Sequence, residues 1–195
     1  MQTKSPKPIL AQIKRLEAEL AAARKRIHQL EAQIETDPVL AIPNRRGFER
    51  ELNRAIAHLK RYQSTAGLLF LDLNNLKTVN DSHGHLAGDA ILKAAVTGIH
   101  GQVRRSDVVG RFGGDEFTIL LWNVTKSSLR AKAKSLETMI AALRIPFAGE
   151  ILRITACAGM TMLRSQDDTV GAIARADADM YVRKCNLLSR VAVDP

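Results

Sequence analysis

The sequence RFGGDEF at residues 111–117 decides the fold class and points to the chemistry of this chain. A pair of glycines is followed by two adjacent acids, Asp115 and Glu116, and the segment lies between strand-like apolar runs at 107–112 and 116–122. Glycines readily adopt the positive φ angles that a tight hairpin turn requires. The pattern predicts a β-hairpin with two carboxylates at its tip. These acids are either solvated turn residues or part of a site for metal ions and phosphates.

Apolar periodicity on both sides of this hairpin predicts the remaining elements. The expected elements are helices at 45–61, 86–103, 126–143 and 168–186 and strands at 66–73, 107–112, 116–122 and 152–162. From residue 66 to residue 162 the order is β-α-β-β-α-β, the split βαβ order of ferredoxin-like and palm-type folds. We therefore predict the α/β (α+β) class, with a mainly antiparallel sheet flanked by helices.

In that topology the third strand lies between the first two and runs antiparallel to both. The end of strand 66–73 then meets the start of strand 116–122, so Asp72 is expected beside Asp115 and Glu116. Three carboxylates without a thiol or histidine cluster form a hard oxygen site that suits Mg²⁺. Two such ions about 4 Å apart can activate a hydroxyl and stabilise a leaving pyrophosphate. The alternative is that these acids are merely exposed at strand ends.

The N-terminal part of the chain shows a heptad repeat. Its apolar residues follow a strict 4-3 spacing: Ile9, Ile13, Leu16, Leu20, Ala23, Ile27, Leu30 and Ile34. Isoleucine at one core position and mostly leucine at the other favour two parallel strands, in which Glu19 would face Arg24 of a second chain. We predict a disordered tail at 1–8 and a parallel dimeric coiled-coil helix at 9–36 that ends before Pro38. A single amphipathic helix lying on its own domain is the alternative.

The formal net charge of +9 suits a polyanionic ligand. We do not expect a nucleic-acid partner, because basic residues are interleaved with acids and only 4% of residues are aromatic. A nucleoside triphosphate is a sufficient polyanion. No apolar run approaches the roughly 20 residues of a membrane-spanning helix, and no signal peptide precedes the first helix. We therefore expect no membrane contact and a cytoplasmic location.

A second motif, at residues 72–89, reads DLNNLKTVNDSHGHLAGD. With RFGGDEF, it makes the chain from residue 37 to residue 195 resemble the GGDEF family of bacterial diguanylate cyclases, whose pattern here is DxDxFKxINDxxGHxxGD. The resemblance implies a GGDEF domain at 37–195 that condenses two GTP into cyclic di-GMP and two pyrophosphates. It also implies Mg²⁺ as cofactor, with Mn²⁺ as a second ion that such ligands accept, and a homodimer in which each subunit holds one GTP.

The resemblance assigns roles to individual residues. Those that match metal ligands are Asp72, Leu73 (through its carbonyl), Asp115 and Glu116, of which the last two would be catalytic. Those that match GTP-binding residues are Lys77, Asn80, Asp89, Gly113, Gly114 and Lys184. Asn80 and Asp89 would read guanine, because an amide can donate to O6 or N7 and a carboxylate accepts from N1 and N2. On local sequence alone, Asn80 and Asp81 indicate a turn or a helix cap.

A third element is RRSD at residues 104–107. Arg104 and Asp107 match the family's RxxD product-inhibition site, because Asp107 precedes Gly113 by the expected interval. In that site an arginine and an aspartate bind cyclic di-GMP. The alternative is a charged helix end followed by a capping aspartate.

The chain also departs from the family patterns. DxLTGLxNRR appears as DPVLAIPNRR at 37–46, and ADxALYxAK appears as ADADMYVRK at 176–184. The Gly-Arg-Asn expected next is Leu-Leu-Ser at 187–189, which removes an arginine near the triphosphate. Arg183 or Arg190 could replace it. The loss of this arginine motivates an alternative function, a weakly active or inactive GGDEF module that senses GTP or cyclic di-GMP and signals through its coiled coil. The sequence does not identify an activating signal.

Overall fold

The protein is described from a computed structural model that covers residues 12, 15–17, 19–20, 24 and 35–191. The chain divides into two units, Met1–Glu35 and Thr36–Pro195. In the first unit the described positions between residues 12 and 24 are helical, and Leu16 and Leu20 are exposed. The predicted tail at 1–8 and most of the predicted coiled coil lie outside the described residues. Dimerisation through this unit stays a prediction.

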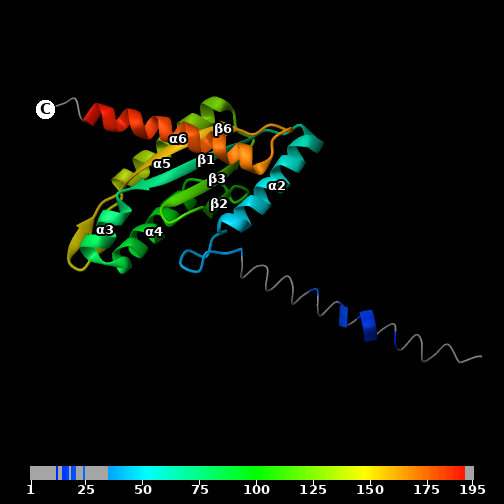
Figure 1. The fold of residues 1–195 in the computed structure, drawn as a ribbon, viewed down its shortest axis with the longest axis horizontal. Helices are drawn as coiled ribbons and strands as arrows, with labels where there is room; N and C mark the ends of the chain where they lie inside the picture. Colours follow the sequence, from blue (N-terminus) through cyan, green and yellow to red (C-terminus); the bar gives the residue numbers. More distant parts are fainter. Residues whose placement is uncertain (1–11, 13–14, 18, 21–23, 25–34, 192–195) are drawn as a thin grey trace, which may run out of the picture. The chain divides into compact units, whose positions relative to one another are not determined.

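The second unit contains helices and strands in the order shown in Figure 1. They are α2 (Arg45–Tyr62), β1 (Ala66–Asn74), α3 (Leu76–His83), α4 (His85–His100), β2 (Val108–Arg111), β3 (Glu116–Trp122), α5 (Lys126–Ala142), β4 (Ile145–Phe147), β5 (Glu150–Leu152), β6 (Thr155–Met162) and α6 (Thr169–Val191). Within the described part of the chain, no helix is both long and apolar enough to cross a membrane.

The main sheet confirms the predicted topology. Its four strands lie in the order β2-β3-β1-β6, and every neighbouring pair is antiparallel. β3 therefore lies between β1 and β2, as the split βαβ order requires. The register of β1 against β3 pairs Ala66 with Trp122 at one end and Asp72 with Glu116 at the other. The last pair is the one that the sequence predicted.

Alternate residues of β1 enter two different cores, because successive side chains of a strand point to opposite faces. Leu69 and Leu71 pack with α4 and α5 in the larger apolar cluster. Leu68 and Phe70 pack with α2 and α6 in the smaller one. Figure 1 shows α6 running along the sheet, where it contacts β6 and β1. Asp72 continues the alternation on the α6 side.

Two parts of the fold differ from the sequence prediction. Residues 76–83 form the separate helix α3, which Gly84 breaks from α4 with a φ of 82°. A small β4–β5 hairpin, turned at Gly149 with a φ of 88°, precedes β6, so the predicted strand 152–162 is divided. Both additions are short, and Pro146 interrupts the apolar pattern of the hairpin. An eight-residue helix and three-residue strands carry too few periods for detection.

Candidate active site

The end of β1 places an acid against a lysine of α6. Asp72 is 9% exposed, and its Oδ1 lies 2.5 Å from the Nζ of Lys184. An ionised carboxylate in so little water needs such a partner. Lys184 therefore reaches the sheet end that the sequence assigned to phosphate chemistry, and it retains partial exposure there.

Glu116 lies directly opposite Asp72, at the first position of β3. Burial raises the pKa of Glu116 above its ordinary value, and neighbouring carboxylates add to that increase. In decreasing order of effect, they belong to Asp115, Asp72 and Asp177, while the Arg45 guanidinium lowers the pKa. A site that resists the ionisation of its own glutamate is one in which a bound cation would be stabilised.

The three predicted carboxylates do not gather into one cluster. In the described residues, no set of three His, Cys, Asp or Glu side chains lies close enough together to hold a metal ion. Asp72 pairs with Lys184, and the Glu116 carboxylate lies against Gly113. A ligand set of two carboxylates and one main-chain carbonyl remains available at the end of β1. The main chain of Leu73 adjoins the hairpin tip, because its N–H donates to the Asp115 carbonyl at 3.0 Å.

The hairpin tip corrects one sequence prediction. Gly84 and Gly149 are the glycines with positive φ in the described residues, so neither Gly113 nor Gly114 adopts the expected left-handed conformation. The space beside Gly113 is instead occupied by the Glu116 side chain. A Cβ at that position would overlap the Glu116 carboxylate, so any other residue would displace this acid.

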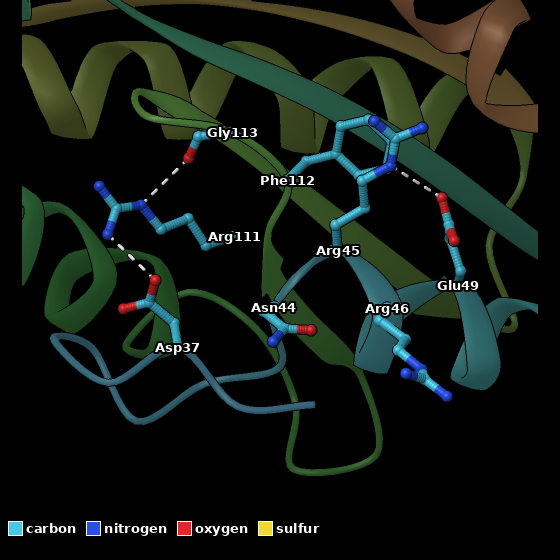
Figure 2. Close-up of a pocket in the computed structure, with 8 residues that line it drawn as sticks. All are labelled: Asp37, Asn44, Arg45, Arg46, Glu49, Arg111, Phe112 and Gly113. Atoms are coloured by element: carbon cyan, nitrogen blue, oxygen red, sulfur yellow. Dashed lines mark hydrogen bonds and ion pairs between the residues drawn. The ribbon is translucent and has the colours of Figure 1, made fainter. Parts of the chain in front are cut away.

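Arg111 holds the tip from the β2 side, as Figure 2 shows. Its guanidinium donates to the carbonyls of Gly113, at 3.1 Å, and Gly114, at 2.7 Å. It also pairs with Asp37 at 3.0 Å, and both side chains are largely buried. The remaining Asp37 oxygen accepts the N–H groups of Val39 and Leu40. Two residues to which the sequence gave no role thus fix the turn that carries Asp115 and Glu116.

Next to this pair is an open pocket of about 610 Å³. In Figure 2 the Arg45 guanidinium lies over the Phe112 ring, 4.5 Å from its centroid, and its Nε contacts Glu49 at 3.0 Å. These contacts hold Arg45 near Glu116, whose pKa it lowers. The pocket is an extension of the hairpin site, and three arginines, Arg45, Arg46 and Arg111, line it.

We expect Asp37→Asn to weaken both the fold and the site. The substitution keeps an oxygen for the turn N–H groups but removes the charge that pairs with Arg111. The loss of a charge-assisted bond should cost about 2 kcal/mol, which corresponds to a fall in melting temperature of roughly 4–8 °C for a domain of this size. A hairpin released from Arg111 should also lose about tenfold in turnover, since small displacements of reacting groups are costly.

Asp167→Asn is the matched control for this prediction. It removes a carboxylate that pairs with Arg175 at 2.6 Å, far along the chain from the hairpin. Its melting temperature should fall while turnover is retained. Equal losses of turnover in the two variants would show that Asp37 acts through general stability alone.

The two residues that the sequence predicts to read guanine lie on α3 and α4. The break at Gly84 folds α4 back on α3, and the two helices contact each other. The Asn80 amide lies so close to Gly88 that a Cβ there would overlap it. Gly88 directly precedes Asp89, so the two predicted guanine-reading residues are brought to neighbouring positions. The Asn80 Oδ1 is buried and has no hydrogen-bond partner among the described residues.

The predicted product site at 104–107 is built as a capped turn. Asp107 accepts the N–H of Arg104 at 2.8 Å through one oxygen and the N–H of Trp122 at 3.0 Å through the other. Arg104 is exposed. The structural role of Asp107 is therefore the capping one, and Arg104 supplies the cation that a phosphate would meet. Lys77 is likewise exposed, on α3.

Comparison with known proteins gives these features a family. The family model described as diguanylate cyclase, GGDEF domain, matches residues 34–188. The chain belongs to the GGDEF family. The diguanylate cyclase DgcP of Pseudomonas aeruginosa is 31% identical over 176 residues, which cover 90% of this chain and 26% of that protein. The cyclic di-GMP phosphodiesterase PdeR of Escherichia coli is 32% identical over 169 residues, 85% of this chain and 25% of that protein.

The fold of the GGDEF relatives agrees as well. A crystal structure of the coiled coil and GGDEF domain of DgcB from Caulobacter crescentus, in complex with c-di-GMP, superposes with a TM-score of 0.77 at 23% identity. The match covers 91% of this chain and 95% of that one. This chain spans about a quarter of the curated relatives named above. One of those relatives is named a cyclic di-GMP phosphodiesterase, so membership of the GGDEF family does not by itself decide the activity.

Arg183, one of the two candidates to replace the missing family arginine, is engaged by other groups in this structure. Arg183 contacts Glu137 at 2.9 Å and also donates to the Ala158 carbonyl, so its guanidinium is engaged away from the Asp72 carboxylate. The side chain of Arg190, the other candidate, lies outside the described side chains. The acids of the GGDEF motif are present, and Lys184 of the C-terminal motif contacts Asp72 at the end of β1.

Proposed function

We propose that the protein is a Mg²⁺-dependent diguanylate cyclase. Each of two GTP molecules would lose pyrophosphate as the 3′-hydroxyl of one attacks the α-phosphorus of the other. Two phosphodiester bonds form, two Pα–O bonds to pyrophosphate break, and the two hydroxyl protons leave. The product is cyclic di-GMP with two pyrophosphates.

One observation carries this proposal. The pair of Asp72 and Glu116 lies where β1 ends, and the next elements along the chain, α3 and α4, bring Asn80 beside Gly88 and Asp89. The acids and the lysine that would bind the triphosphate thus lie close in space to the end of β1. The amide of Asn80 and the carboxylate of Asp89, which would bind the base, follow directly on α3 and α4. Guanine presents both acceptors and donors on the edge that such a pair would meet.

The residues present fit a divalent cation. Asp72, the Leu73 carbonyl and Glu116 are hard oxygen donors, with Asp115 nearby. Burial, and after it repulsion from the Asp115 and Asp72 carboxylates, raises the pKa of Glu116. A bound Mg²⁺ or Mn²⁺ would supply neutralisation of the triphosphate and of the attacking oxygen. Lys184 would move from Asp72 to the phosphates, and Arg111 would keep the hairpin in place. Asp115 would accept a hydrogen bond from the 3′-hydroxyl.

The proposal is tested by incubating the pure full-length chain with GTP and Mg²⁺ and separating the products. Cyclic di-GMP and pyrophosphate should appear in a ratio of one to two. GTP that stays intact, or is only hydrolysed to GDP, would contradict cyclase activity. EDTA should stop the reaction and excess Mg²⁺ should restore it.

Two facing domains are required because each subunit would hold one GTP. Leu16 and Leu20 are 57% and 51% exposed in the single chain, as expected for core positions of a coiled coil that a second chain would cover. Arg15 and Glu19 form an i,i+4 pair on the same helix, at 2.9 Å. A parallel pair would raise the effective concentration of the two domains.

Replacing both Leu16 and Leu20 by Asp should convert the protein to a monomer. Buried like charges at the seam would each cost several kcal/mol. Ultracentrifugation should show the monomer, and activity per subunit should collapse at low concentration and partly recover as concentration rises. Ala18→Asp with Ala22→Asp is the control, since the heptad places both outside the seam. Activity per subunit that is unchanged by dilution in a proven monomer would contradict the two-subunit mechanism.

Product inhibition should depend on Arg104. Wild-type progress curves should flatten as cyclic di-GMP accumulates, and Arg104→Ala should keep them straight, because an arginine–phosphate bond is charge-assisted. Arg105→Ala, the exposed neighbour, is the matched control and should behave like wild type. Equal flattening in all three proteins would leave Arg104 without this role.

A second candidate function is a catalytically weak GGDEF module that binds GTP or cyclic di-GMP as a signal. Leu-Leu-Ser at 187–189 and the engagement of Arg183 by Glu137 favour it, because together they leave fewer cations for the triphosphate. Nucleotide binding without turnover in the assay above would select this alternative.

A further inference from the structure

The outer edge of β6 is bonded to side chains instead of a fifth strand. β6 is an edge strand, and Ala158 turns both its N–H and its carbonyl outward. The N–H donates to the Glu137 carboxylate of α5 at 3.0 Å, and the carbonyl accepts from Arg183 of α6. Two residues further along, the Met160 N–H donates to Asp179 of α6 at 2.8 Å.

Glu137 and Arg183 close this arrangement around the edge. Their side chains meet at 2.9 Å, although α5 and α6 lie on opposite faces of the sheet. Glu137 is 8% exposed, and its Oε1 meets both the Arg183 guanidinium and the Ala158 N–H, while the exposed Lys134 lies 3.7 Å from its Oε2. We call this set of Glu137, Arg183 and Ala158 the edge clamp. Asp179 and Arg183 stand where the family pattern ADxALYxAK has alanine, so the clamp is not implied by the motif.

Two residues of the edge clamp are sequence neighbours of residues at the Lys184–Asp72 ion pair. Arg183 precedes Lys184, and Ala158 follows Cys157, the residue that pairs with Asp72 across β1 and β6. Adjacent residues of a helix point about 100° apart. When Arg183 turns outward over the strand edge, Lys184 is directed inward over the sheet to Asp72, which it meets at 2.5 Å.

We propose that Glu137 and Arg183 are positioning residues that set the rotation of α6 and thereby deliver Lys184 to the triphosphate. The inference rests on the proposed function, in which Lys184 contacts phosphate. α6 lies so close to β6 at Gly159 that a Cβ there would overlap the main chain of Ala176 and Met180. The helix therefore has no space to approach further, and rotation about its axis is the movement that the edge clamp restrains.

The test measures the binding of 3′-deoxy-GTP, which lacks the attacking hydroxyl, to the full chain in the presence of Mg²⁺. Arg183→Met keeps the length of the side chain but removes the clamp, and should raise the Kd about five- to tenfold. Glu137→Gln, which keeps an acceptor for Ala158, should act in the same direction. Arg183→Lys should restore part of the affinity. Arg175→Met, which breaks the pair with Asp167 earlier in α6, is the control for general destabilisation and should bind like wild type.

Coupling to Lys184 separates positioning from stability. In a Lys184→Met background, Arg183→Met should change the Kd less than twofold, because the lysine that it positions is already absent. An equal loss of affinity with and without Lys184, or a Kd for Arg183→Met and Glu137→Gln that equals wild type, would overturn the inference. Wild-type protein that fails to bind 3′-deoxy-GTP would instead overturn the proposed function. Melting temperatures and circular dichroism identify any variant that does not fold, and the conservative Arg183→Lys then carries the comparison.

Discussion

Glu116→Gln should abolish cyclic di-GMP production and, at the same time, stabilise the protein in the absence of metal. Loss of one charge from a transition-state site should reduce turnover at least 10²-fold. Stability should rise because burial and the carboxylates of Asp115 and Asp72 raise the pKa of Glu116, so its ionised form is disfavoured in the fold. The glutamine has nearly the same shape and no charge.

The stability gained by Glu116→Gln should depend on pH. A carboxyl whose pKa is raised in the folded state binds more protons than in the unfolded state, so stability falls as pH rises from the ordinary pKa through the raised one. The gain in melting temperature of Glu116→Gln should be fully present above that window and should shrink on acidification through it. Saturating Mg²⁺ should remove the advantage by stabilising the wild type alone.

Melting curves at several pH values, with and without Mg²⁺, and Mn²⁺ binding by electron paramagnetic resonance test the assignment. Glu51→Gln is the control, because Glu51 forms surface pairs with Arg50 and Arg54, which contribute little. Normal turnover, or undiminished Mn²⁺ binding, in Glu116→Gln would refute the assignment of Glu116 as a metal ligand.

We expect kcat/KM to be about 10³- to 10⁴-fold lower with ATP than with GTP. The Asp89 carboxylate would face the N1–H and N2 donors of guanine but the N1 acceptor of adenine, and an unpaired polar group in such a site is costly. The Asn80 amide would donate to O6 of guanine, whereas adenine has the N6 amino donor at that position and would leave the amide donor unpaired.

Asp89→Asn should reduce this discrimination at least tenfold, mainly by lowering activity with GTP. Asp81→Asn is the matched control, since Asp81 is an exposed acid of α3 next to Asn80. It should leave the GTP to ATP ratio unchanged. Comparable rates with the two nucleotides in the wild type would exclude the assignment of Asn80 and Asp89 to the base.

Local pattern and topology together were sufficient for the sheet and for the position of the acids. Once β-α-β-β-α-β was read from the periodicity, the pairing of Asp72 with Glu116 followed from the strand order, and the structure confirms it. The same reasoning could not fix where the carboxylates point. Their directions depend on Lys184, which comes from an element over a hundred residues away, and on the space above Gly113.

The supporting contacts were invisible in the sequence for the same reason. Arg111 meets Asp37 across 74 residues, and Arg183 meets Glu137 across 46. Pairs of this kind depend on tertiary packing, and neither periodicity nor turn chemistry reports them. The wrong expectation for Gly113 shows the limit of local reasoning: a glycine pair before two acids indicates a turn, but the need for glycine arose from a side chain three residues later.

The outer border of β6 has a consequence for a protein that is expected to work by bringing two copies of itself into repeated contact. An exposed edge strand offers a row of unpaired main-chain N–H and C=O groups, through which identical chains can form a continuous sheet and aggregate. The main-chain N–H groups of Ala158 and Met160 are already occupied by Glu137 and Asp179. This edge therefore offers fewer free main-chain groups to the sheet of a second domain, which disfavours sheet-to-sheet pairing between two copies.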